Sequence, residues 1–138
     1  MKKLKLPDVP SELILLALND LELIEKNPNY IVNMTRWHDY CDVDQICYAC
    51  FAGAVMAGTL RSNFREVLDP HDFGKNYNKL AALDAFRLGD IILGLHEMGI
   101  HKTNILSDYF RVTPYQESPK AWKIDMMAMV DFLKSKGH

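Results

Sequence analysis

The stretch of the sequence richest in reactive side chains carries one histidine and all three cysteines of the chain. Their spacing is H-x2-C-x5-C-x2-C, formed by His38, Cys41, Cys47 and Cys50. Imidazole and thiolate are the usual ligands of tetrahedral structural zinc, so a small zinc-binding domain is one interpretation. Such a domain usually joins two well-separated ligand pairs, whereas these four residues lie within a short segment. We therefore expect no metal and no other cofactor, and the zinc site stands as an alternative.

A second interpretation makes Cys50 a catalytic nucleophile. Gln45, Cys47 and Cys50, ahead of an apolar run, resemble the signature of the papain-like proteases, where the catalytic cysteine begins the central helix. That resemblance implies Cys50 as nucleophile and Gln45 as oxyanion donor, with His96 or His101 as the general base. Gln45 stands one residue too close, and the residues between the cysteines are not that family's glycine and serine. A cysteine-dependent hydrolase is therefore the alternative function.

The small residues around the last two cysteines favour a third interpretation, a closely packed core. Free cysteine behaves as a small hydrophobic residue and is among the most often buried types. With Asp44 as N-cap, residues 45–60 are predicted to form the central helix, with Cys47 and Cys50 in the core. Residues four apart share a helix face, so small residues form two ridges on which neighbouring helices can pack. These ridges are Ala49, Gly53 and Ala57, and Cys50, Ala54 and Gly58.

Cap and stop signals place the other helices. Ser11 is a predicted N-cap before a run of apolar residues at helical spacing, and Pro28 ends that helix. Ser118 followed by proline begins the last helix, whose predicted apolar stripe is Trp122, Met126, Met129, Val130 and Leu133. Residues 1–10 are read as an extended lead-in, and residues 30–37 as a short strand or extended segment. The sequence therefore predicts a mainly α fold, an irregular helical bundle with one domain over residues 1–138.

Composition narrows the function classes. The chain has 138 residues and a formal charge of -2, whereas duplex-binding modules are usually basic, so nucleic acid is not the expected partner. The longest uncharged apolar stretch, residues 46–60, is shorter than the roughly 20 residues that span a bilayer, so no membrane association is expected. An odd number of cysteines without a secretory signal favours reducing cytoplasm. The expected setting is cytoplasmic.

Three segments in the middle half of the chain resemble small, uncharacterised accessory proteins encoded by tailed bacteriophages. They are Trp37-His38, the run from Cys47 to Ala57, and Ala82-Leu83-Asp84-x-x-Arg87-x-Gly89-Asp90. This resemblance implies a bacterial host cytoplasm, and it implies no particular activity. Small accessory phage proteins commonly act by binding a host protein or a small signal molecule. We therefore expect a non-catalytic binding protein, whose partner is a host or phage protein or a small molecule.

The polar and aromatic residues of those segments are the candidate binding residues. They are Trp37, His38, Asp84, Arg87 and Asp90. A simpler explanation for Arg87 is an ion pair with Asp84 or Asp90 across one helical turn. The sequence favours that local pairing, and the oligomeric state is left open.

Overall fold

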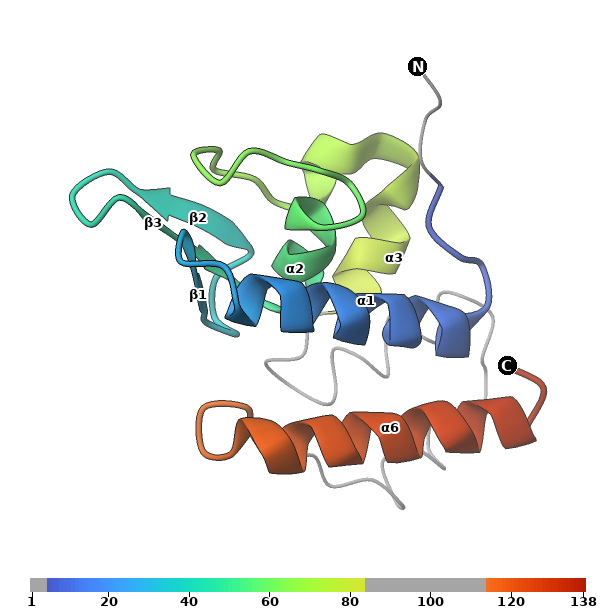
Figure 1. The fold of residues 1–138 in the computed structure, drawn as a ribbon. Helices are drawn as coiled ribbons and strands as arrows, with labels where there is room; N and C mark the ends of the chain where they lie inside the picture. The colour runs from blue at the N-terminus through green and yellow to red at the C-terminus, as the bar shows by residue number, and fades with distance from the viewer. Residues whose placement is uncertain (1–4, 84–113) are drawn as a thin grey trace.

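A computed structural model of the chain describes residues 5–83 and 114–138. Four α-helices, three short strands and one 3-10 helix make up this part of the protein (Figure 1). In chain order they are α1 (Pro10–Glu25), β1 (Tyr30–Val32), β2 (His38–Cys41), β3 (Ile46–Ala49), α2 (Phe51–Ala57), η1 (Pro70–Asn76), α3 (Tyr77–Ala82) and α6 (Pro119–Ser135). Within the described ranges, no helix is both long enough and apolar enough to cross a bilayer.

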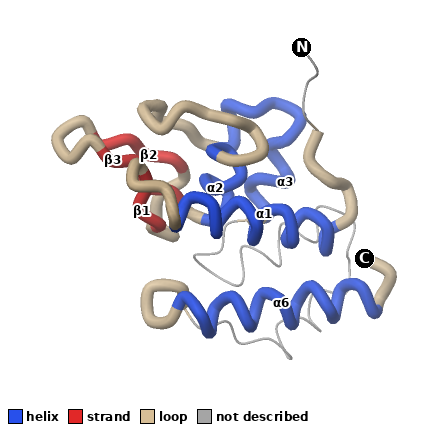
Figure 2. Tube along the Cα trace, viewed as in Figure 1, coloured by secondary structure: helices blue, strands red, loops and turns tan. Residues whose placement is uncertain are grey.

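The fold is α+β, so the prediction of a mainly α helical bundle is wrong. Three strands form one mixed sheet in the order β1-β3-β2 (Figure 2). β3 is the central strand; it runs parallel to β1 and antiparallel to β2. Of the three strands, the sequence predicted only one, the short strand within residues 30–37, and it is confirmed as β1.

The error arises at residues 45–60, which were predicted to form one helix. Residues 46–49 are instead β3, and Gln45 takes a positive φ of 55° in the turn that joins β2 to β3. Burial alternates along β3, which is the period of a strand and not of a helix. Pairing with two neighbouring strands outweighs the helical preference of the small residues, because strand preference depends on tertiary context. Asp44 consequently caps no helix, and Cys50 is the N-cap of α2.

The close-packed central helix is confirmed for residues 51–57, where Phe51 to Met56 are all buried. A side chain at Gly53 would overlap the carbonyl oxygen of Trp37, and one at Gly58 would overlap the carboxylate of Asp20. These two glycines therefore let the chain before β2 and helix α1 approach α2 closely. Asp20 is itself buried, and it accepts hydrogen bonds from the backbone N–H and the hydroxyl of Thr59 at 3.2 and 2.7 Å.

Helix α1 lies between α6 on one side and α2 with α3 on the other (Figure 1). The predicted apolar stripe of α6 is confirmed, because all five of its residues are buried. The predicted cap is confirmed as well, since the hydroxyl of Ser118 accepts from the N–H of Ala121 at 3.2 Å. Ser11 is not a cap: Val9 occupies that position, and the N–H of Ser11 donates to the carbonyl oxygen of His138 at 3.0 Å.

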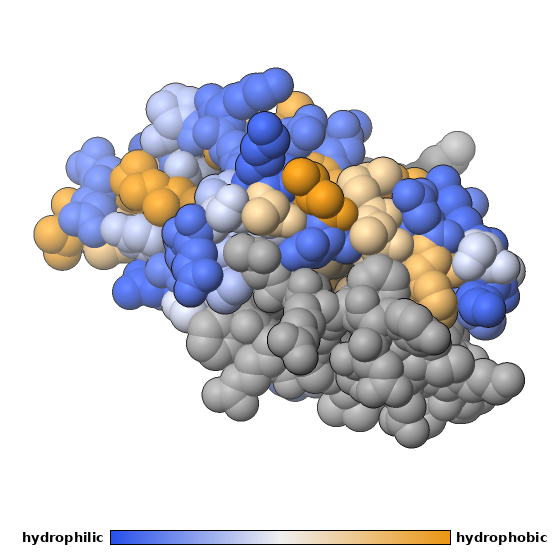
Figure 3. Space-filling model, turned by 90° about the horizontal axis from the view of Figure 1, so that it is seen from below, coloured by the Kyte–Doolittle hydropathy of each residue, from blue (hydrophilic) through white to orange (hydrophobic). Residues whose placement is uncertain are grey.

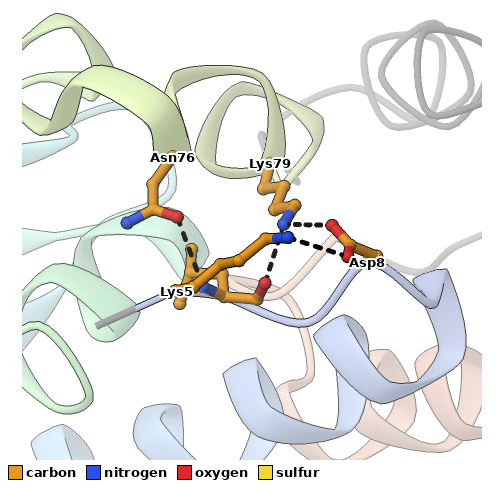
Figure 4. Close-up of polar contacts among 5 residues, drawn as sticks. Lys5, Asp8, Asn76 and Lys79 are labelled. Carbon is orange, nitrogen blue, oxygen red and sulfur yellow. Dashed lines mark hydrogen bonds and ion pairs between the residues drawn. The ribbon is translucent and has the colours of Figure 1, made fainter. Parts of the chain in front are cut away.

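The extended lead-in, described from residue 5 onward, is hydrogen-bonded to the end of η1 and to α3 (Figure 4). The Lys79 ammonium donates to the Leu6 carbonyl oxygen at 2.7 Å and to the Asp8 carboxylate at 2.6 Å. The side-chain oxygen of Asn76 accepts from the N–H of Leu6 at 3.2 Å. Hydrogen bonds from Lys79 and Lys5 lower the pKa of Asp8 below its usual value. These contacts place the Leu6 side chain in the core.

Candidate functional site

Two of the residues singled out in the sequence meet on the inner face of the sheet. The β2–β3 register sets His38 beside Ala49 and Tyr40 beside Cys47. Paired residues share a face, so His38 and Cys47 lie on the same side. The Cys47 sulfur is 3.5 Å from His38 Nδ1, and both residues are fully buried. The geometry thus brings a thiol next to an imidazole, and the protonation of the ring decides what this pair can do.

Both ring nitrogens of His38 have hydrogen-bond partners. Nδ1 lies 2.8 Å from the carbonyl oxygen of Glu66, which can only accept, so Nδ1 carries the proton and donates it. Nε2 is then the acceptor, and it takes a hydrogen bond from the Tyr30 hydroxyl at 3.2 Å. Burial lowers the pKa of His38, which favours the neutral ring. The imidazole therefore ties together β1, β2 and the loop before η1.

Cys47 is not activated by this neighbour. Nδ1 of His38 already holds a proton, so it cannot remove the proton of the thiol. Burial raises the pKa of the Cys47 thiol to about 12, which leaves almost no thiolate near neutral pH. The contact is therefore a packed core contact, and the predicted burial of Cys47 is confirmed.

Cys50 has a structural position at the start of α2. Its sulfur accepts the N–H of Gly53 at 3.5 Å and lies 3.7 Å from the carbonyl oxygen of Trp37, to which the thiol donates. Gln45, the suggested oxyanion donor, is exposed in the hairpin turn at the opposite end of β3. Five extended residues span about 16 Å, so the two side chains are not brought together. The suggested bases, His96 and His101, lie outside the described residues.

The zinc alternative needs His38, Cys41, Cys47 and Cys50 around one point. Cys41 is paired with Ile46, one position along from the Tyr40–Cys47 pair. Side chains alternate along a strand, so Cys41 faces the opposite side of the sheet from His38 and Cys47. Among residues 5–83 and 114–138, no group of three His, Cys, Asp or Glu residues could hold a metal ion.

The candidate binding residues are divided by the fold. Trp37 is half-buried against the core, and its carbonyl oxygen accepts the N–H of Cys50 at 3.2 Å. His38 is buried, so its ring faces the interior and not the solvent. Three further candidates lie outside the described residues: Asp84, Arg87 and Asp90. Of the two candidates that the structure describes, Trp37 and His38, only Trp37 is partly accessible to solvent.

The outer face of the sheet presents a group that the sequence did not reveal. Tyr48 on β3 stands opposite Ile31 on β1 and Asp39 on β2. The Arg36 guanidinium carbon lies 4.6 Å from the centre of the Tyr48 ring, and its nitrogen is 3.6 Å from Asp39 Oδ2. Ile31 is 47% exposed. We call these four residues the outer sheet face. No sequence signal pointed to it, because residues 46–49 do not alternate between polar and apolar types.

The two faces of the sheet thus differ in what they offer a ligand. The thiol and imidazole groups on the inner face are held by internal hydrogen bonds, whereas the outer sheet face is accessible to solvent. Comparison with protein-family models, with curated proteins and with solved structures found no match to this chain. What the protein does must therefore follow from its own side chains and surfaces.

Proposed function

We propose that the chain is a non-catalytic accessory protein that binds another protein through the outer sheet face. The supporting observation is the stacking of Arg36 on Tyr48 in the middle of a half-exposed strand surface. Tyrosine and arginine are enriched among the residues that contribute most to protein–protein binding. Ile31 beside them adds apolar area that a partner would cover.

The side chains of this face are already held in place. The Tyr48 hydroxyl donates to Asp44 at 3.0 Å, and Arg36 is positioned by both the Tyr48 ring and Asp39. Tyr48 also stands on β3, which is paired on both sides. Side chains that are ordered before binding lose less conformational entropy when a partner arrives. This preorganisation favours a binding role for the face.

The resemblance to tailed-phage accessory proteins suggests that the partner is a protein of the bacterial host. The form of the outer sheet face agrees with a protein partner, because small molecules usually bind in concave sites that enclose most of their surface. A small signal molecule is the second candidate, and it would need a different surface from this one. The buried states of Cys47 and Cys50 give no support to a thiol hydrolase.

Affinity purification with matched baits tests this proposal. The test bait carries Arg36→Glu and Tyr48→Ala, and the control bait carries Lys75→Glu and Leu23→Ala, which alter one exposed charge and one exposed apolar residue elsewhere. We expect a host protein that the wild-type and control baits retain and the test bait loses. Titration of the purified pair by calorimetry then checks direct contact. A partner that all three baits retain equally would refute the assignment of this face.

A further inference from the structure

Helix α6 has a second apolar surface on the side away from the core. Ile124 is 60% exposed and Met127 is 41% exposed, although the opposite side of the helix is buried and packs against α1. Figure 3 views the molecule from the side on which α6 lies in Figure 1, and it shows hydrophobic residues exposed among hydrophilic ones. A shallow groove runs along this surface, and its lining includes Lys120, Lys123, Ile124, Met127, Ala128 and Asp131.

The exposed residues follow a regular order along the helix. Lys120, Ile124, Met127 and Asp131 are separated by four, three and four positions, which places them in one stripe. This is the spacing by which two helices pack side by side at a small crossing angle. The stripe has a base at one end, two apolar residues in the middle and an acid at the other end. Two such stripes that run in opposite directions would therefore place the base of each opposite the acid of the other.

We propose that this stripe is a self-association surface, occupied by α6 of a second copy of the chain in antiparallel orientation. A two-fold axis between Ile124 and Met127 would place Lys120 of one copy opposite Asp131 of the other. The same axis would place Ile124 opposite Met127. Such an interface is closed and uses the same patch on both copies, as in most homodimers.

The charges at the ends of the stripe support this occupant. Within the described part of the chain, neither Lys120 nor Asp131 takes part in an ion pair. Lys120 also stands in the first turn of α6, where the helix dipole favours an anion over a cation. An antiparallel partner would bring its own Asp131 to that position, so each copy would supply the charge that the other lacks.

The remaining charges near the stripe do not oppose the docking. Lys134 follows Asp131 at helical spacing, and the proposed register places it beside Glu117 of the second copy. Lys123 is paired with Glu25 of its own chain at 2.5 Å, so it does not need a partner in the second copy. In the proposed register Lys123 lies opposite Ala128, a small residue that leaves room for the lysine stem. The contact covers about three turns of one helix, so each copy buries less surface than the roughly 800 Å² per partner of a standard stable interface. The dimer is therefore reversible and depends on concentration.

Analytical ultracentrifugation of the full chain with charge-exchanged variants tests the proposal. Wild type is expected to shift from monomer to dimer as its concentration rises to about 1 mM. Lys120→Asp and Asp131→Lys should each weaken the dimer, by about tenfold in Kd, because each repulsive pair occurs twice. The double variant Lys120→Asp/Asp131→Lys should restore association. Lys75→Asp is the matched charge control and should leave the Kd unchanged.

A mixing experiment with the two single variants tests the antiparallel register. The Lys120→Asp chain carries two acids at the ends of the stripe, and the Asp131→Lys chain carries two bases. An equimolar mixture should therefore associate more strongly than either variant alone. Circular dichroism is the check that each variant is folded, and we expect native spectra because both positions are exposed. A wild type that stays monomeric, a double variant that fails to recover, or a mixture no stronger than its components would overturn the proposal. A foreign protein held by this stripe while the chain stays monomeric would overturn it too.

Discussion

The carbonyl oxygen of Trp37 occupies the space in which a side chain at Gly53 would have to stand. The N–H of Cys50 donates to the same oxygen at 3.2 Å, so one carbonyl group joins the start of β2 to the first turn of α2. The absence of a side chain at Gly53 is thus what permits the sheet and the central helix to meet. Close packing, and not a catalytic role, therefore explains the small residue at Gly53 in α2.

Gly53→Ala is expected to destabilise the fold by at least about 2 kcal/mol, because the added methyl group meets a backbone atom that cannot rotate away. The measurement is the urea denaturation midpoint. Gly137→Ala is the matched control: its φ of 81° strains a side chain, but nothing lies within 4 Å of the added carbon. That control should cost about 1 kcal/mol. Equal losses for the two variants would contradict the close approach of Trp37.

Cys47 and Cys50 are expected to resist iodoacetamide in the native state, because both thiols are buried in the core. Cys41 is partly exposed and should be alkylated first. The measurement is the rate of modification of each cysteine by mass spectrometry between pH 6 and 9, with a urea-unfolded sample as the reference. Fast alkylation of Cys50 alone, well below the ordinary thiol pKa of about 8.5, would revive the hydrolase alternative.

His38 is expected to make the fold less stable in mild acid. Its pKa is lowered by burial, so the unfolded chain takes up the proton first as the pH falls below about 6.5. The free energy of unfolding should therefore decrease from that pH down to the lowered pKa of the folded state, by at most about 1.4 kcal/mol per pH unit. The His38→Gln variant should be less stable at neutral pH. Its free energy of unfolding should no longer show this decrease below about pH 6.5. An unchanged slope would mean that His38 is not buried in the neutral form.

Asp20 is expected to contribute the opposite pH dependence. Burial raises the pKa of this carboxyl group, and hydrogen bonds from Thr59 only partly offset that effect. The folded chain therefore takes up the proton before the unfolded chain does, and this group's contribution to stability increases as the pH falls through the raised pKa. Asp20→Asn removes the charge and keeps an acceptor for Thr59. Its stability relative to wild type should be highest near pH 7 and should fall towards pH 4; a constant difference would contradict a buried carboxylate.

Local signals in the sequence placed the start of α6 and the end of α1, although the start of α1 was wrongly assigned to Ser11. Ser118 and the proline after it begin α6, and residues at helical spacing form its buried stripe. Pro28 lies just beyond the end of α1, as expected of a helix stop. These features are predictable because a helix satisfies its backbone hydrogen bonds within four residues, so the required information lies in the segment itself.

Only the tertiary structure decided that residues 46–49 form a strand, and the candidate site depends on that strand. The hydrogen-bond partners of β3 come from β1 and β2, so no property of the segment itself could show that it would become a strand. That pairing turns Cys47 towards His38 on the inner face and Tyr48 towards Arg36 on the outer one. The sequence by itself determined which residues are apolar, small or charged, where α1 ends and where α6 begins. Which of those side chains meet, and which stay exposed, depends on contacts between distant segments, and these exist only in the folded chain.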